Sequence, residues 1–318
     1  MRQGAVCVLG GTGFVGGHVT ARLVAAGYPV RILTRHQYRH PDLKVLPGVT
    51  LEECDPYDAR ALRRSFSGCE TVINLIGILN ERHRNGFYRT HVQLPRLLIE
   101  TSKEMGVQRF LQMSAIGADS SAPSKYLKSK AQGEDFVHTI SGPAVAATSF
   151  RPSVIFGPED QFFNRFARLL KQVPCVFPLA CPEAQFAPVY VGDVADAMVA
   201  TIQDPESFGK RIELCGPKEY RLRQLVEYTA REIHVRKRII GLPDWASRLQ
   251  AKILGVAPGR PFTLDNYHSL SVPSVCREKG SCPTRIERIV PKYLGGLNPA
   301  ASLQHKREQF WVHQKTAG

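Results

Sequence analysis

The first 150 residues alternate between two patterns of apolar positions. Short continuous apolar runs, typical of strands buried on both faces, are each followed by a stretch in which apolar side chains return every three or four positions. The runs predict strands at Ala5–Leu9, Val30–Thr34, Val49–Cys54, Thr71–Ile76, Arg109–Met113 and Ala146–Arg151. The stretches between them predict helices at Gly16–Ala26, Ala59–Ser67, Val92–Met105 and Ser124–Ile140. Because strands that alternate with helices form parallel sheets, we predict an α/β fold with a Rossmann-type, doubly wound parallel sheet.

Beyond residue 157 the alternation stops, and proline and glycine separate short segments. Frequent proline and glycine residues between short segments are typical of irregular structure. We therefore predict a Rossmann domain over residues 1–157 and a smaller, irregular carboxy-terminal substrate lobe over residues 158–318.

The longest apolar runs are far shorter than the ~20 residues that cross a bilayer, so we predict no transmembrane segment. The first strand begins within five residues of Met1 and is followed at once by glycines, so we expect neither an export signal nor an import segment. These features favour a cytoplasmic protein, or a mitochondrial matrix protein if the chain has been trimmed.

Eight cysteines are scattered through the chain, without a Cys-x-x-Cys pair or a histidine spacing suited to zinc. We expect no metal site, and we interpret the cysteines as reduced thiols of a cytosol-like compartment. Cys276 and Cys282 are a pair that could form a disulfide, although reduced thiols are favoured for them as well.

The formal net charge of +14 is concentrated in residues 205–318, which hold 20 basic and 10 acidic residues. A basic surface favours an acidic protein partner or an anionic membrane surface such as the inner membrane. Trp245, Leu249 and residues 252–254 suit a short amphipathic helix that lies on such a surface, or equally one that packs on the protein's own core. The basic run Val235–Arg238 is too short to predict nucleic-acid binding.

Glycines at positions 10, 13 and 16 stand directly after the first predicted strand and open the first predicted helix. This spacing permits a tight turn, a close approach of the backbone to a pyrophosphate, and close packing of helix on sheet. The amides at the helix start then face the phosphates of a dinucleotide. The residues predicted to bind it here are Gly10, Gly11, Thr12, Gly13, Phe14, Val15 and Gly16.

The ends of the next strands indicate which dinucleotide is bound. The second strand ends at Thr34 and is followed by Arg35, where NAD-binding folds place an acidic residue. Because Arg35 suits a 2′-phosphate, NADP(H) is favoured over NAD(H). Asp55 is a candidate for the adenine amine or, equally, a turn or helix-cap residue. After the fourth strand, Ile76 and the small Gly77 leave room for the cofactor.

Tyr126 and Lys130 lie four positions apart on a predicted helix and therefore share one face. A neighbouring ammonium and a cationic cofactor ring favour the phenolate of a tyrosine, which then exchanges a proton with substrate. Ser114, just past a strand end, is placed to hydrogen-bond the substrate oxygen. These three residues are the predicted catalytic set.

With these motifs, the chain resembles the extended or atypical short-chain dehydrogenases/reductases, including the NAD-dependent epimerases/dehydratases. Residues 151–158 resemble the segment beside the nicotinamide, which implies that Pro152 and Val154 contact the cofactor. Residues 188–195 resemble the segment that leads back to the Rossmann domain, so about 188–215 are expected to belong to it.

Four stretches resemble, within this superfamily, the group of the NADPH-holding accessory subunit of the complex I alpha subcomplex and its bacterial relatives. They are Val72–Gly77, Phe87–Val92, Ser114–Asp119 and Leu242–Ala251. This resemblance implies NADP(H) binding and a link to quinone or membrane-associated metabolism.

The sequence is compatible with three functions. The first is an oxidoreductase for a hydrophobic carbonyl, alcohol or quinone-related substrate, in a pocket lined partly by residues 161–186. The phenylalanines of that segment suit either such a pocket or an ordinary core. The second is a non-catalytic NADP(H)-binding accessory or assembly factor for a respiratory or quinone-biosynthesis complex. The third is a nucleotide-sugar epimerase/dehydratase, which the missing acidic residue after the second strand disfavours.

Overall fold

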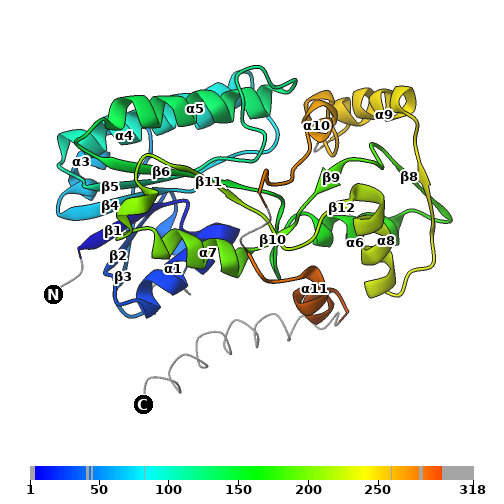
Figure 1. Ribbon diagram of the computed structural model, residues 1–318, viewed down its shortest axis with the longest axis horizontal. Helices are drawn as coiled ribbons and strands as arrows, with labels where there is room; N and C mark the ends of the chain where they lie inside the picture. The colour runs from blue at the N-terminus through cyan, green and yellow to red at the C-terminus, as the bar shows by residue number, and fades with distance from the viewer. Residues whose placement is uncertain are drawn as a thin grey trace, which may run out of the picture.

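A seven-stranded parallel sheet forms the centre of the protein, as the computed structural model shows (Figure 1). The structure describes residues 4–40, 43, 46–81, 83–258, 260–278 and 282–295. The strands lie in the order β11-β6-β5-β4-β1-β2-β3, which is the doubly wound arrangement that the sequence predicts. They are β1 (Ala5–Leu9), β2 (Val30–Thr34), β3 (Val49–Glu53), β4 (Cys69–Asn74), β5 (Arg109–Met113), β6 (Ala146–Pro152) and β11 (Arg211–Leu214).

Helices cover both faces of this sheet, which explains why its strands are apolar on both sides. In Figure 1, α1 (Phe14–Ala25) and α7 (Val191–Ala200) lie below the sheet and pack on each other. On the other face lie α3 (Ala59–Phe66), α4 (Leu94–Glu104) and α5 (Lys125–Ser141). Two apolar cores result, one on each face of the sheet.

The helix predicted to begin at Val92 begins earlier, with a π-helical turn. This turn, η2 (Tyr88–Gln93), continues directly into α4. It packs on α5 at Gly133, where an added Cβ would lie 1.6 Å from the carbonyl oxygen of His91. The absence of a side chain at Gly133 therefore lets the two backbones touch.

The remaining chain forms a smaller lobe of short helices and two-stranded sheets around a core of its own. Residues 191–214 leave this lobe and supply α7 and β11 to the central sheet. The other elements are η1 (Gln37–Arg39), β7 (Ile155–Phe156), α6 (Phe163–Gln172), β8 (Val176–Leu179), β9 (Gln185–Phe186), β10 (Val189–Tyr190), η3 (Pro205–Ser207), β12 (Tyr220–Arg221), α8 (Leu222–Glu232), β13 (Arg238–Gly241), α9 (Asp244–Val256), α10 (Leu264–Leu270) and α11 (Ile286–Leu294).

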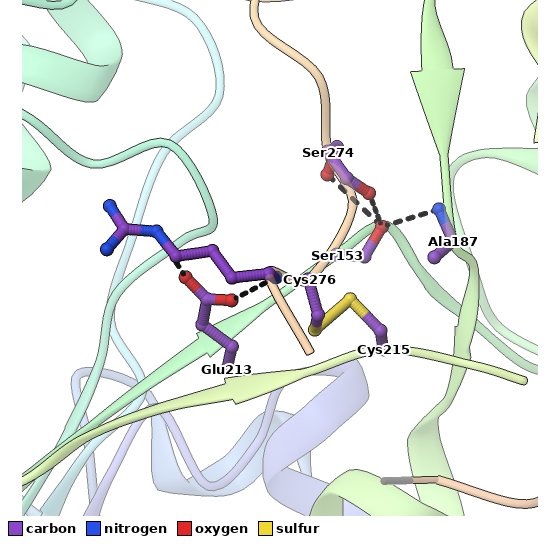
Figure 2. The surroundings of a disulfide bond; sticks show 7 residues. Ser153, Ala187, Glu213, Cys215, Ser274 and Cys276 are labelled. Carbon is purple, nitrogen blue, oxygen red and sulfur yellow. Dashed lines mark hydrogen bonds and ion pairs between the residues drawn. A yellow bond between two sulfur atoms is a disulfide. The ribbon is translucent and has the colours of Figure 1, made fainter. Parts of the chain in front are cut away.

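A disulfide between Cys215 and Cys276 ties the end of β11 to the segment that follows α10 (Figure 2). Beside it, the Ser153 hydroxyl donates a hydrogen bond to the carbonyl oxygen of Ser274 at 2.6 Å. The prediction that all cysteines are reduced is wrong for this pair, and Cys276 bonds to Cys215 rather than to Cys282. The bonded cysteines are 61 positions apart, so the bond joins two segments that are distant in the sequence.

Among the described residues, no helix is both long enough and apolar enough to cross a bilayer. Helix α9 nevertheless turns an apolar face to solvent. The side chains on that face are exposed to 70% for Trp245, 49% for Leu249, 59% for Ile253 and 87% for Val256. The small residues Ser247 and Ala251 are buried on the opposite face. The face that holds Trp245 and Leu249 therefore does not pack on the protein's own core.

Candidate active site

A cavity of about 2420 Å³ lies between the carboxyl ends of the sheet strands and the smaller lobe. Open α/β sheets bind their ligands at this edge, where loops that follow the strands converge. One end of the cavity is formed by the glycine-rich loop after β1, and the other by α6 and the segments around α10. The cavity therefore brings together segments from both halves of the chain.

The glycine-rich loop forms a cradle for a pyrophosphate. Gly10 has a φ of +78°, and an added Cβ at Gly16 would lie 2.2 Å from the carbonyl oxygen of Gly10. Helix α1 starts directly after Gly13, which has no side chain to cap the first amides, so these amides remain available to an anion. The predicted loop residues that line the cavity are Gly10, Gly13, Phe14, Val15 and Gly16. Gly11 instead packs on Ile32, and Thr12 lies in the same turn.

Near the end of β2, Arg35 lines the cavity with an exposed side chain. Asp55 lines it as well, and its Oδ1 accepts a hydrogen bond from the Tyr57 amide at 3.1 Å. The helix cap of α3 is Asp58, which accepts hydrogen bonds from the amides of the first turn. The helix-cap alternative for Asp55 is therefore wrong, and a turn residue that faces the cavity remains.

The loop after β4 approaches helix α5. Gly77 lines the cavity, and an added Cβ there would lie 3.1 Å from the Lys130 Nζ. Its lack of a side chain therefore makes room for the lysine ammonium. Ile76 packs on the apolar core instead of lining the cavity. Pro152 and Val154, at the end of β6, line the cavity opposite.

Tyr126 and Lys130 lie on one face of α5 and both line the cavity. Burial raises the pKa of Tyr126 to about 12, so its phenol is protonated at neutral pH. The Lys130 Nζ donates a hydrogen bond to the Met113 carbonyl oxygen at 3.1 Å, and burial lowers its pKa to about 8.

The hydroxyl of Ser114 lines the same cavity but already has an acceptor. It donates a hydrogen bond to Glu134 Oε2 at 2.7 Å. Glu134, whose side chain is only 1% exposed, also pairs with Arg151 at 3.0 Å and with Arg211 at 2.8 Å. The Ser114 proton is therefore committed to a buried ion pair. Sequence reasoning missed Glu134, although its place four residues after Lys130 puts it on the same helix face.

A neutral histidine supports the loop that faces Lys130. His91 Nε2 accepts a hydrogen bond from the Ile78 amide at 3.1 Å, and its Nδ1 lies 2.9 Å from the Ser129 hydroxyl. Burial and the charge of Lys130 lower the pKa of His91 to about 2, so the ring stays uncharged at neutral pH. His91 lies in the stretch Phe87–Val92 that the sequence analysis singled out, but no role for its side chain was predicted there.

The smaller lobe caps the start of helix α5. Asp265 of α10 accepts hydrogen bonds from the backbone amides of Lys125 at 2.6 Å and Tyr126 at 3.1 Å. A carboxylate is a favourable partner for the first amides of a helix because these amides have no acceptor within the helix. The position of Tyr126 therefore depends on a residue 139 positions further along the chain.

Aromatic side chains from residues 161–186 lie in or against the core of the smaller lobe, and several of them also line the cavity. Phe163 is fully buried and packs edge-on against Phe156, with ring centroids 6.0 Å apart. The phenylalanines that line the cavity are Phe162, Phe166, Phe177 and Phe186. Phe177 and Phe186 also belong to the buried core of the smaller lobe, and Phe162 and Phe166 pack against it. The core alternative is therefore confirmed, and the substrate pocket stays a prediction.

Residues 6–215 match the family described as the NAD dependent epimerase/dehydratase family. This match spans every strand of the central sheet and the residues of α5 that face the cavity. The chain belongs to this family. As a member of it, the protein is an NAD(P)-binding protein of the short-chain dehydrogenase/reductase type, and the resemblance stated from its motifs is confirmed.

Two curated relatives and one solved structure illustrate the range of similar proteins. Subunit 9 of the NADH dehydrogenase (ubiquinone) 1 alpha subcomplex of Mus musculus is 36% identical over 80% of this chain and 68% of its own length. The ceramide reductase of Caulobacter vibrioides is 29% identical over 76% of this chain and 74% of its own. The structure of the Thermus thermophilus UDP-glucose 4-epimerase in complex with NAD aligns over 83% of this chain and 98% of its own length, with a TM-score of 0.61. Because the two sequences are only 19% identical, this similarity shows the shared fold alone.

Proposed function

We propose that this family member is an NADP(H)-dependent reductase of a hydrophobic carbonyl compound. The observation that carries the proposal is the position of the Tyr126 phenol, which lines a cavity with an aromatic wall. A neutral phenol is poised to donate a proton to a carbonyl oxygen, which is the proton movement of reduction. The name of the ceramide reductase, which refers to a lipid, agrees with this substrate class.

The chain's own residues divide the proposed work between them. When bound, the nicotinamide supplies a hydride, while the glycine-rich loop holds its pyrophosphate. Tyr126 donates the proton to the carbonyl oxygen, and Lys130, fixed by the Met113 carbonyl, places a positive charge close to the phenolate that results. The apolar wall excludes water and binds the hydrocarbon part of the substrate.

The function is tested by mixing the purified protein with NADPH and a series of long-chain ketones, with a sugar nucleotide as comparison. We expect the absorbance of the reduced nicotinamide to fall with a long-chain ketone and the corresponding alcohol to accumulate in equal amount. The second candidate is a non-catalytic NADP(H)-binding accessory subunit, which the 36% identity to the complex I subunit favours. Tight NADPH binding without oxidation by any carbonyl or quinone would establish that candidate instead.

We propose NADP(H) rather than NAD(H) because Arg35 lines the cavity at the end of β2. Glu53, next to it on β3, also lines this end and limits the preference. Arg35→Ser is expected to weaken NADPH binding by roughly tenfold or more, because a charge-assisted contact to a phosphate is lost, and to change NADH binding little. Titration calorimetry with both cofactors checks this. Equal losses for NADPH and NADH would contradict a role in recognising the 2′-phosphate.

We also propose that the protein is cytoplasmic and that the exposed face of α9 binds an anionic membrane surface, which would give it a peripheral location on the inner membrane. Its apolar side chains, Trp245, Leu249, Ile253 and Val256, are accompanied on the helix by Arg248 and Lys252. A helix with apolar residues flanked by cations is typical of segments that lie in a lipid interface. Residues Gln250 and Leu254 of the same helix line the cavity, so its opening would lie close to the lipid.

Flotation with vesicles tests this surface. The protein is expected to float with vesicles that contain anionic lipid at low salt, and the double variant Trp245→Ser/Ile253→Ser should lower its partition at least about tenfold, because two large apolar contacts are lost. Ile240→Ser, which removes an exposed apolar residue from β13, is the matched control. If the wild-type protein did not float with the vesicles, the membrane proposal would be wrong. An acidic protein partner would then be the proposed ligand of this face.

A further inference from the structure

Helix α6 presents an unusual combination of side chains to the cavity. Its cavity face carries an apolar stripe with two arginines along one flank. Arg165 is half-buried and Arg168, one turn later, is exposed, so the pair extends from the interior of the cavity toward its mouth. The apolar residues of the stripe are Phe162, Phe166, Leu169 and Val173.

Neither guanidinium pairs with a carboxylate within the described ranges of the chain. Burial and the charge of Arg168 lower the pKa of Arg165, so the two cations repel each other in a partly desolvated place. Other arginines of the protein do pair with carboxylates. Arg151 and Arg211, for example, both form ion pairs with Glu134. Two adjacent cations beside a ligand cavity are thus left for an anion from outside the chain.

The cofactor has its own anion sites at the opposite end of the cavity. Its pyrophosphate faces the start of α1, and Arg35 follows β2; both belong to the central sheet domain. Helix α6 belongs to the smaller lobe, which lies to the right of α1 and the central sheet in Figure 1. An anion bound by Arg165 and Arg168 would therefore belong to the second ligand.

We propose that Arg165 and Arg168 form an anion subsite for the substrate, and that the substrate is an amphipathic anion. Its hydrocarbon part lies along the apolar stripe of α6, and a phosphate or carboxylate at one end binds the two guanidinium groups. This inference rests on the proposed function for the place of the carbonyl group, which faces Tyr126. It names a substrate class that the aromatic wall alone does not define.

Binding of decyl phosphate to the protein saturated with NADP⁺ tests the subsite by titration calorimetry, below the concentration at which the probe forms micelles. Saturation with cofactor blocks its own phosphate sites. We expect Arg165→Gln/Arg168→Gln to weaken binding about tenfold or more, because charge-assisted hydrogen bonds are lost. Arg165→Lys/Arg168→Lys, which keeps the charges, should bind within about threefold of wild type. Arg288→Gln, which removes an exposed arginine of α11, should have no effect.

Two results would overturn the inference. Unchanged affinity for decyl phosphate in the double glutamine variant would show that these arginines do not bind the anion. Inorganic phosphate that binds as tightly as decyl phosphate would show that no apolar part is recognised. The proposed reductase function fails separately, if no ketone oxidises NADPH while decyl phosphate still binds through the two arginines.

Discussion

Tyr126→Phe is expected to lower the turnover number for a long-chain ketone by roughly 100-fold to 10,000-fold, the range that a positioned general acid supplies. The change removes only the hydroxyl, because the phenylalanine ring keeps the edge-on contacts of Tyr126 with Phe87 and His91 at 5.9 and 5.5 Å. Affinity for NADPH should therefore stay within about twofold of wild type. Steady-state oxidation of NADPH and calorimetric titration of the cofactor measure the two quantities.

Tyr267→Phe provides the matched control, since its hydroxyl lies outside the cavity and donates a hydrogen bond to Asp244 on the neighbouring helix. It should leave turnover unchanged. If Tyr126→Phe kept more than a third of wild-type turnover, the phenol would not be the proton donor. The proposed transfer of a proton from Tyr126 to the carbonyl oxygen would then be wrong.

Gly133→Ala is expected to destabilise the protein by about 3 kcal/mol or more, and to abolish turnover in any molecules that fold. The added Cβ would lie 1.6 Å from the carbonyl oxygen of His91, which is backbone and has no freedom to rotate away. Helix α5 would have to move away from η2, and Tyr126 and Lys130 would move with it. The midpoint of urea unfolding and the ketone assay measure the two effects.

The control for this change is Gly17→Ala in α1, where an added Cβ meets no described atom within 4 Å. There the same substitution should stabilise the protein by about 0.5–1 kcal/mol, because alanine loses less conformational freedom in a helix interior. A Gly133→Ala protein as stable as wild type would mean that the close approach of η2 and α5 is not needed.

The regular half of the fold was predictable because its signals are local. Strands β1, β2 and β5 begin and end at the predicted residues, since each is a short apolar run bounded by turn-forming or polar residues. The glycine-rich loop was predictable for the same reason, because its spacing follows directly from a turn between a strand and a helix. The shared face of Tyr126 and Lys130 required only helical periodicity.

The contacts that support the site were not predictable because they join distant parts of the chain. Glu134 meets Arg211 only after β11 has returned to the sheet edge, and Cys215 meets Cys276 by the same route. The π-helical turn at Tyr88–Gln93 has no compositional signal, since it is selected by the close packing at Gly133. Periodicity and motif spacing carry no information about such long-range neighbours.

The hydrogen bonds from Lys125 and Tyr126 to Asp265 bear on how such proteins diversify. The family match ends at residue 215, so the cap of helix α5 comes from a part of the chain outside that match. A lobe transplanted from a relative to change substrate would therefore need a carboxylate at the position of Asp265. A graft without it would lose catalytic geometry even if its pocket were correct.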